Sequence, residues 1–342
     1  MKKKISYLLV FILLALLVAA WLLFGSATAF DEKSKYIFIR AGENVQQQVE
    51  KQIDTGHIVK FPAVFKLAAS QTGVWEKLKP GRFEIKNGTS IFNLARMLRN
   101  NIQSPVKLVI NKLRTKENFA KLLGKNFSFD SSSAMEFFTS NDSLLQLDVD
   151  TNTVFTLLIP DTYLFNWNIS LENLLDKLKS EQQKFWNSSR LQLASEQNLS
   201  PQQVYAIASI VEEETNKNDE KGAIASVYIN RMNKGMALGA DPTIKYALRD
   251  FALKRIYYKY LDVASPYNTY RNKGLPPGPI CTPSQASIDA VLNAPRTDYL
   301  FFVAKSDFSG YHHFSNNFAE HDRYAKEYQR ALDSLILSRK KN

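Results

Sequence analysis

The chain has 342 residues, of which 45% are hydrophobic and 23% charged, with one cysteine, Cys281. This size allows a membrane segment and two modest folded domains, and the single thiol excludes an internal disulfide. The formal charge of +11 suits nucleic acid, an anionic membrane or a polyanionic polymer. Because the lysines are spread out and the sequence has neither a zinc-finger pattern nor an aromatic-plus-basic RNA platform, a solvated basic surface is favoured over nucleic acid as a partner.

The first thirty residues predict a membrane anchor. Three lysines at positions 2–4 precede an uncharged run from Ile5 to Gly25, and about 20 apolar residues suffice to span a bilayer as a helix. We therefore expect residues 1–4 to be a cytoplasmic tail and 5–25 a transmembrane helix, with the chain after Phe30 outside the cytoplasmic membrane. The alternative is a signal peptide cleaved at Ala27-Thr28-Ala29, but the apolar run exceeds the roughly 7–15 residues of a signal core.

Residues 33–105 predict a small α+β module with two strand-helix units. In the first unit, a strand that contains Tyr36 and Phe38 ends at Gly42 and is followed by a helix. The second unit has a strand from Arg82 to Ile85, an Asn-Gly turn, and a helix. The apolar residues of that last helix recur at the spacing of one helical face: Ile91, Leu94, Ala95 and Leu98.

After Pro105 a strand-like stretch opens a second domain, which we expect to cover 106–335. The polar stretches FSFDSSSA and TSNDS predict loops between short helices. Leucines at helical spacing from Leu171 to Leu178 predict an amphipathic helix. A further helix begins at Ser200, because Ser200 and Gln203 form the Ser-x-x-Gln pattern of a capping box around Pro201.

This further helix ends in three consecutive glutamates, and its periodicity separates them. On a helical wheel Glu214 lies beside the apolar stripe, Glu212 lies off its other flank, and Glu213 points away into solvent. A carboxyl at the edge of an apolar stripe is partly desolvated, which raises its pKa and suits a general acid. The alternatives are a solvated acidic helix end or a buried glutamate paired with an arginine. The stripe consists of Val204, Ile207, Ala208 and Val211.

Turn-rich segments downstream carry polar side chains that can bind a sugar. Asn268, Thr269 and Tyr270 offer hydrogen-bond donors and a flat ring, although Asn and Thr are also common turn formers. Three histidines lie close together, at His312, His313 and His321, but their spacing matches no zinc pattern, so we expect no metal site. Cys281 lacks the signs of a catalytic Cys-His pair.

Several motifs, in order along the chain, resemble the YceG-like family of endolytic murein transglycosylases. They are Pro160-Asp-Thr-Tyr163, Ala208-Ser-Ile-Val-Glu-Glu-Glu-Thr215, Ile229-Asn-Arg231, Asp241-Pro-Thr243, Tyr267-Asn-Thr-Tyr270, Gly274-Leu-Pro-Pro-Gly278 and Tyr299-Leu-Phe-Phe-Val303. The resemblance implies a transmembrane helix, a small LysM-like module matching 33–105, and a mixed α+β catalytic domain with its catalytic glutamate on a helix.

The resemblance also implies roles for individual residues. The family's catalytic acid precedes the Thr of this glutamate motif, which corresponds to Glu214, the residue that the helical wheel selects independently. The expected glycan-binding residues are Asp241, Thr243, Asn268, Thr269, Tyr270, His312 and Phe314. No cofactor or metal is implied.

The expected activity is non-hydrolytic cleavage of peptidoglycan strands between N-acetylmuramic acid and N-acetylglucosamine, leaving 1,6-anhydro ends and terminating the elongation of nascent strands. The expected location is the bacterial cytoplasmic membrane, crossed once, with the N-terminus inside and the catalytic domain outside. Cell-wall synthases and elongation machinery are expected partners on family grounds. Two alternatives stay open: a membrane-anchored peptidoglycan-binding protein without activity, and a hydrolytic muramidase that uses Asp241 or Asp161 as a second acid.

Overall fold

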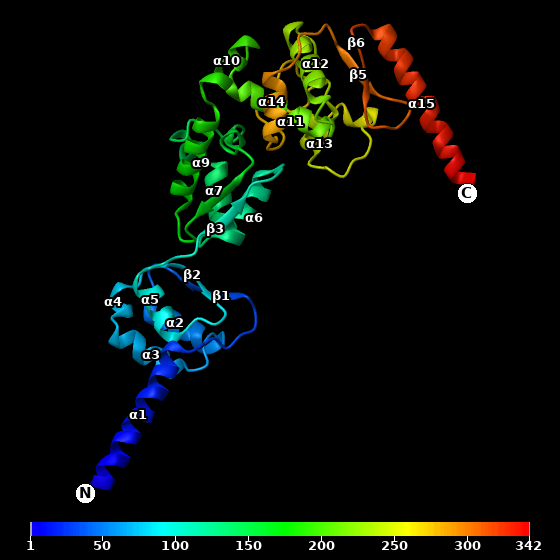
Figure 1. Ribbon diagram of the computed structural model, residues 1–342. Coiled ribbons are helices and arrows are strands. Elements are labelled where there is room, and N and C mark those ends of the chain that lie inside the picture. Colours follow the sequence, from blue (N-terminus) through cyan, green and yellow to red (C-terminus); the bar gives the residue numbers. More distant parts are fainter. Residues whose placement is uncertain (1, 342) are drawn as a thin grey trace. The chain divides into compact units, whose positions relative to one another are not determined.

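The computed structural model describes residues 2–341, and the chain divides into two compact units (Figure 1). The first unit contains the chain up to residue 108, together with 124–130 and 164–170. The second unit contains 109–123, 131–163 and the chain from 171 onward. Helices and strands occur in both units, which confirms the mixed α+β class.

The first unit is built on an antiparallel pair of strands. Ile37 of β1 lies opposite Phe83 of β2, and both are fully buried against the unit's helices. Tyr36 and Phe38, on the other face of β1, are each 38% exposed, so Ile37 and Ile39 supply its core side chains. The elements are α1 (Lys2–Phe24), β1 (Ser34–Ile39), α2 (Val45–Thr55), α3 (Pro62–Gln71), α4 (Val74–Lys77), β2 (Gly81–Lys86) and α5 (Ile91–Arg99).

Helix α5 confirms the apolar face expected from its sequence. Its four apolar residues at helical spacing are buried, and the Ser90 side chain caps the helix by accepting the Asn93 N–H. Helix α1, by contrast, exposes apolar side chains along most of its length. The segment Lys3–Phe24 is long and apolar enough to cross a membrane. At its end Phe24 packs against Phe92 of α5, with ring centroids 5.1 Å apart.

The second unit is mainly helical. Its strands β5 (Phe301–Ala304) and β6 (His312–Ser315) pair with each other. Strand β3 (Val106–Val109), its partner β4 (Thr162–Phe165) and helix α6 (Lys116–Asn126) each contain residues of both units. The other helices are α7 (Ser131–Thr139), α8 (Asn141–Leu145), α9 (Leu171–Phe185), α10 (Ser188–Glu196), α11 (Pro201–Glu214), α12 (Lys221–Asn233), α13 (Asp241–Leu248), α14 (Gln285–Leu292) and α15 (Phe318–Lys341), with the 3-10 turns η1 (Val154–Leu157) and η2 (Tyr258–Tyr260).

Two polar stretches expected to be loops instead begin helices. Helix α7 starts at Ser131, within the serine run, and α8 starts at Asn141. The side chain of Ser140 accepts the backbone N–H of Ser143 and so caps α8. The prediction was wrong here because Ser, Asn and Asp favour helix N-termini as well as turns.

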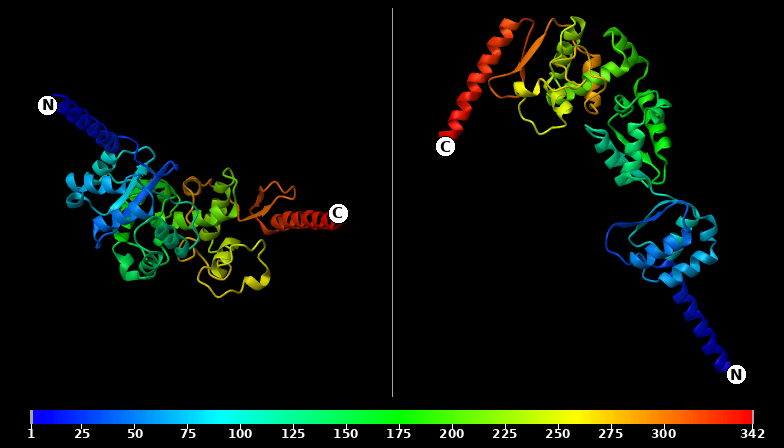
Figure 2. Two further views of the ribbon diagram at one scale, coloured as in Figure 1. Left: turned by 90° about the horizontal axis from the view of Figure 1, so that it is seen from below. Right: turned by 180° about the vertical axis from the view of Figure 1, so that it is seen from behind.

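The core of the second unit lies where α11, α12 and α14 pack together (Figure 1). Strand β5 contacts both α12 and α15, and Figure 2 shows the β5–β6 pair next to the C-terminal helix from two further sides. The hairpin register pairs Phe302 with Phe314 and Ala304 with His312. This arrangement brings the end of α11, the middle of α12, the start of α13 and one strand of the hairpin to a common region.

Candidate active site

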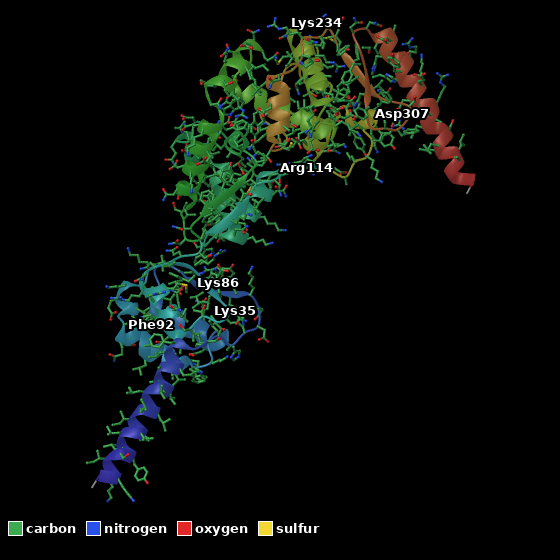
Figure 3. All side chains as sticks on the ribbon, viewed as in Figure 1. Lys35, Lys86, Phe92, Arg114, Lys234 and Asp307 are labelled. Atoms are coloured by element: carbon green, nitrogen blue, oxygen red, sulfur yellow. The ribbon has the colours of Figure 1, made fainter. Side chains whose placement is uncertain are left out.

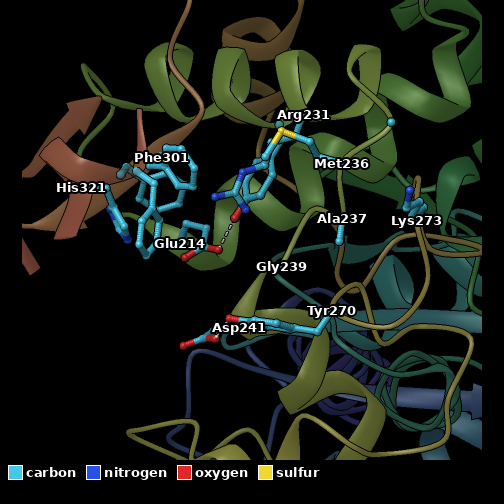
Figure 4. A pocket seen from close by; sticks show the side chains of 14 residues that line it. Glu214, Arg231, Met236, Ala237, Gly239, Asp241, Tyr270, Lys273, Phe301 and His321 are labelled. Atoms are coloured by element: carbon cyan, nitrogen blue, oxygen red, sulfur yellow. Dashed lines mark hydrogen bonds between the residues drawn. The ribbon is translucent and has the colours of Figure 1, made fainter. Parts of the chain in front are cut away.

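A pocket of about 720 Å³ opens at the end of α11 (Figure 4). Its wall combines carboxylates, cations and aromatic rings, which is the composition expected of a site for a polar ligand with ring faces. All of its residues belong to the second unit. They are Glu214, Tyr228, Arg231, Gly235, Met236, Ala237, Gly239, Asp241, Tyr270, Lys273, Phe301, Phe302, Phe318 and His321.

Glu214 is the last residue of α11, and both ends of this helix are fixed. The predicted capping box is confirmed, since Ser200 accepts the Gln203 N–H and Gln203 accepts the Ser200 N–H. Every residue from Val204 to Val211 is buried, so the helix is embedded on more sides than its apolar stripe indicated. At Thr215 the backbone turns to an extended conformation, which ends α11 with Glu214 at the pocket.

The carboxyl of Glu214 is held in a desolvated place. Tyr228 Oη donates a hydrogen bond of 2.5 Å to Glu214 Oε1. Burial raises the pKa of Glu214 to about 7, even though the Tyr228 hydrogen bond lowers it. The negative charge of Asp241 raises this pKa further, and the cations Lys245 and Arg231 lower it. A carboxyl with this pKa can donate a proton near neutral pH and accept one afterwards.

Glu213 does not point into solvent, so the helical-wheel prediction for this residue was wrong. Arg114 donates to it from Nε to Oε1 at 2.9 Å and from Nη2 to Oε2 at 3.0 Å, and only 16% of its side chain is exposed. Lys112 adds a second cation, at 3.5 Å from Oε1. Arg114 and Lys112 belong to the segment after β3, about a hundred residues earlier in the chain. The periodicity of a helix gives no information about partners that are so distant in sequence.

Glu212 is also held as a structural carboxylate. Its Oε2 accepts hydrogen bonds from Ser284 Oγ at 2.6 Å and Ser287 Oγ at 2.5 Å, and Lys221 Nζ lies 3.2 Å away. Burial alone would raise the pKa of Glu212, but the two serine hydrogen bonds and the nearby lysines lower it overall. Of the three consecutive glutamates, only Glu214 lies on the wall of this pocket.

Asp241 and Tyr270, both expected at the site, form a pair on the pocket wall. Tyr270 Oη donates to Asp241 Oδ1 at 2.6 Å. Gly239 lies beside them with φ +57°, and a Cβ there would meet Arg231 Nη1 at 3.3 Å and the Tyr270 ring at 3.6 Å. The glycine thus provides both the left-handed backbone and the close approach that this part of the wall requires.

Three residues expected to bind substrate are buried beneath the wall instead. Thr243, Asn268 and Thr269 are at most 1% exposed. The hydroxyls of Thr243 and Thr269 lie 2.9 Å apart, and Thr269 Oγ1 accepts the Ala240 N–H at 3.0 Å. Asn268 Nδ2 donates to the backbone carbonyls of Leu261 and Val263. These side chains hold together the loops that carry Asp241 and Tyr270.

His312 and Phe314 lie on β6, and neither lines the pocket. His312 Nδ1 lies 3.0 Å from Glu220 Oε2, and its backbone N–H donates to Glu220 Oε1 at 2.8 Å. Both rings contact Phe302, which does line the pocket, at centroid distances of 5.4 Å and 6.2 Å. They therefore support the aromatic wall from behind.

Several pocket residues were not expected from the sequence. Tyr228 and Arg231 are three residues apart on α12, so they share one helical face. Arg231 donates from Nε to the Leu300 carbonyl and from Nη1 to the Leu238 carbonyl, each at 2.6 Å. Arg231 was part of a motif quoted above, whereas nothing local marks Tyr228, because the sequence does not show which face of α12 meets Glu214.

Among residues 2–341 no group of three or more His, Cys, Asp or Glu side chains is arranged to hold a metal ion. His321 stacks on Phe301 with centroids 5.2 Å apart, His313 stacks on Tyr324, and burial lowers the pKa of His321. Cys281 is buried, with Sγ 3.4 Å from the Ser209 carbonyl, and burial raises the pKa of its thiol well above the ordinary value. It has the character of a core side chain.

Comparison with known proteins finds relatives along most of the chain. An endolytic murein transglycosylase of Bacillus subtilis (strain 168) is 35% identical over 191 residues, which cover 53% of this chain and 52% of the relative. The endolytic murein transglycosylase of Streptococcus pneumoniae (strain D39) is 28% identical over 330 residues, which cover 88% of this chain and 59% of the relative. The matched part thus spans between half and three fifths of these relatives.

A crystal structure described as a YceG-like protein from Listeria monocytogenes is also similar. It matches with a TM-score of 0.57 and 25% sequence identity, over 86% of this chain and 99% of the Listeria chain. The YceG-like family matches residues 37–327, which include every residue of the pocket. The chain belongs to the YceG-like family.

Proposed function

We propose that this chain is a peptidoglycan lytic transglycosylase that cleaves glycan strands internally, between N-acetylmuramic acid and N-acetylglucosamine, with Glu214 as its catalytic acid and base. The relatives named endolytic murein transglycosylases support the substrate and the reaction class. The observation that carries the proposal is a carboxyl whose pKa is raised to about 7 by burial, on the wall of a pocket of about 720 Å³. The aromatic and polar wall suits a sugar chain.

In the first step, the protonated Glu214 donates its proton to the glycosidic oxygen as the bond from C1 of the muramoyl residue to that oxygen breaks. The electron pair leaves with the oxygen, which becomes the new hydroxyl of N-acetylglucosamine. Positive charge develops at C1, and the anionic Asp241 on the same wall stabilises it electrostatically. Tyr270 keeps the Asp241 carboxylate oriented through its 2.6 Å hydrogen bond.

In the second step, the Glu214 carboxylate accepts the proton of the muramoyl C6 hydroxyl as that oxygen bonds to C1. The products are one strand that ends in a 1,6-anhydro-muramoyl residue and one strand that begins with an N-acetylglucosamine carrying a free hydroxyl. No water is consumed. Because nucleophile and electrophile belong to the same sugar, proximity replaces much of what a protein nucleophile would contribute. A single carboxyl that alternates between acid and base is therefore sufficient.

One observation favours hydrolysis as a second candidate. Asp241 lines the same pocket as Glu214, and ordinary glycosidases use two carboxyl groups that flank the scissile bond. In that mechanism Asp241 would activate a water molecule or form a covalent intermediate. The products distinguish the two reactions, since hydrolysis leaves a reducing end where the transglycosylase leaves an anhydro end.

The N-terminal part of the chain completes the proposal. We propose that helix α1 is a retained anchor in the cytoplasmic membrane, with the three lysines inside and both folded units outside. The proposed domains are a cytoplasmic tail at 1–4, a transmembrane helix at 5–25, a LysM-like module at 33–105 and the catalytic domain at 106–335. Such an enzyme would act on nascent strands beside cell-wall synthases and the elongation machinery.

The test uses the full chain in detergent and purified peptidoglycan. Wild type should release soluble fragments, and Glu214→Gln should lose at least about 10²–10⁴-fold in rate, which is the usual contribution of a general acid. Circular dichroism of each variant checks that it is folded. Binding of Glu214→Gln to peptidoglycan should persist. Equal activity of wild type and a folded Glu214→Gln would remove Glu214 from the mechanism, and binding without any cleavage by wild type would favour a binding protein.

A further inference from the structure

We propose that Tyr228 is a positioning residue for Glu214, which fixes Oε1 as the hydrogen-bond acceptor and leaves Oε2 to carry the reacting proton towards the pocket. This inference rests on the proposed function of Glu214. Tyr228 Oη lies 2.5 Å from Oε1. In a protonated carboxyl group the carbonyl oxygen is the better acceptor, so a donor on Oε1 places the proton on Oε2.

The donor is rigidly placed. Tyr228 is only 2% exposed, and its ring meets the Phe302 ring edge to face, with centroids 5.9 Å apart. Burial and the neighbouring Glu214 raise the pKa of Tyr228 well above its ordinary value, so the phenol keeps its proton at any pH at which the enzyme would work. Tyr228 therefore remains a donor whether Glu214 is acid or carboxylate.

Other charged groups surround Glu214 but do not replace this contact. Among the side chains of the described part of the chain, Tyr228 makes the only hydrogen bond to the Glu214 carboxyl. Arg231, on the same helix, has Nε and Nη1 committed to backbone carbonyls. The remaining titratable or charged neighbours are Asp241 and Lys245 on α13, Tyr270 and Lys273 on the adjoining loop, and His321 on α15.

The contact has a role in both steps of the reaction. When Glu214 gives up its proton, the new carboxylate keeps one hydrogen bond on Oε1, so negative charge is stabilised as it develops. Oε2 does not bind Tyr228, so it can accept the proton of the C6 hydroxyl in the second step. Removing the donor makes Glu214 a weaker acid, because the hydrogen bond favours the ionised form and lowers its pKa.

The first experiment titrates Glu214 directly in the full chain, without substrate. Infrared difference spectra between wild type and Glu214→Gln isolate the carboxyl band, and its loss with rising pH gives the pKa. In Tyr228→Phe we expect this pKa to rise above that of wild type and the carbonyl stretch to move to higher frequency, since Oε1 has lost its donor. A strengthened donor should do the opposite, so 3-fluorotyrosine at position 228 should lower the pKa.

Tyr205→Phe is the matched control. It removes an equally buried phenol hydroxyl, which donates to the Leu158 carbonyl at 2.6 Å and makes no contact with Glu214. Its Glu214 titration should match wild type. If neither Tyr228 variant moved the band or the pKa, Tyr228 would have no positioning role, whether or not the chain cleaves glycan.

The second experiment measures glycan cleavage against pH. Tyr228→Phe should reduce the rate about tenfold to a hundredfold, the usual effect of losing a hydrogen bond to a charged group, and should move the alkaline limb of kcat/KM to higher pH. A residue that only supports packing would lower the rate with the limb unmoved, and that result would overturn the proposal. If wild type cleaves nothing while the infrared shifts appear, the proposed function fails and the positioning contact stands.

Discussion

Arg114 donates two hydrogen bonds to the carboxylate of Glu213, from Nε at 2.9 Å and from Nη2 at 3.0 Å. Arg114 is labelled in Figure 3, where it lies in the second unit. Side-on pairing of this kind fixes the geometry of both partners. It joins the end of α11 to the segment after β3, so the residue next to the proposed acid has a structural role.

Glu213→Gln should therefore cost stability and spare catalysis. We expect a loss of about 1 kcal/mol in the free energy of unfolding, because the bidentate charge pair is lost while partial exposure of Arg114 limits its strength. Urea unfolding of the full chain measures this loss. Glu181→Gln is the control, since its pair with Lys184 is more exposed. A large loss of activity without a loss of stability would show that Glu213 takes part in the chemistry.

Glu214→Gln should make the protein more stable at alkaline pH. At acidic pH the carboxyl is protonated in both the folded and the unfolded chain. As the pH rises, the unfolded chain ionises near the ordinary value of 4.5, whereas the folded chain holds its proton until about pH 7, so folding loses stability through this window. The penalty approaches about 3 kcal/mol at most, and solvent in the pocket reduces it.

Thermal unfolding of wild type and Glu214→Gln at about pH 5 and about pH 8 measures this effect. The stability of the variant relative to wild type should be greater at the higher pH. A difference that did not change with pH would mean that the pKa of Glu214 is not raised in the folded protein.

Asp241→Asn should shift the pH dependence in the direction opposite to Tyr228→Phe. Burial is the main cause of the raised pKa of Glu214, and the negative charge of Asp241 adds to it. Asparagine removes that charge, so the alkaline limb of kcat/KM for glycan cleavage should move to lower pH. A limb that stays in place would indicate that Asp241 does not act on Glu214 through its charge.

Thr269→Val should destabilise the wall of the pocket. The substitution keeps the shape but leaves the buried Ala240 N–H without its acceptor and removes the hydroxyl that lies 2.9 Å from Thr243 Oγ1, which keeps its hydrogen bond to the Ala240 carbonyl. We expect a cost of about 1–3 kcal/mol in the free energy of unfolding. Thr269→Ser keeps the hydroxyl and should lose clearly less. A loss in Thr269→Val that is no greater than the loss in Thr269→Ser would show that the hydrogen bonds of the Thr269 hydroxyl contribute little to stability.

Local patterns predicted much of the fold because they act over a few residues. The capping box at Ser200, the buried face of α5 and the leucine face of α9 depend on spacing alone, and each is confirmed. The same periodicity placed Glu214 beside an apolar surface, and it lies at the pocket. The prediction of a loop at the serine run was wrong, because the same residue types favour both turns and helix starts and α7 begins at Ser131.

Long-range partners explain the errors at the site. The helical wheel placed Glu213 in solvent. It could not show the partner of Glu213, because Arg114 lies about a hundred residues earlier in the sequence. Thr269 was expected to line the glycan cleft because its residue type suits a sugar site, and Thr243 because of the family resemblance. Both side chains are buried, and their hydroxyls lie 2.9 Å apart although the residues are 26 positions apart in sequence. Tyr228 was missed because the sequence does not show which face of α12 meets the end of α11.

The most direct test of the central claim is digestion of peptidoglycan by the full chain in ¹⁸O-labelled water, followed by mass spectrometry of the new muramoyl ends. Intramolecular attack by the C6 hydroxyl predicts new ends that are lighter by one water than hydrolysed ends and that contain no ¹⁸O. The Glu214→Gln digest should contain no such new ends. Ends that carry ¹⁸O at C1 would contradict the account, because water would then be the nucleophile and Asp241 the next residue to mutate.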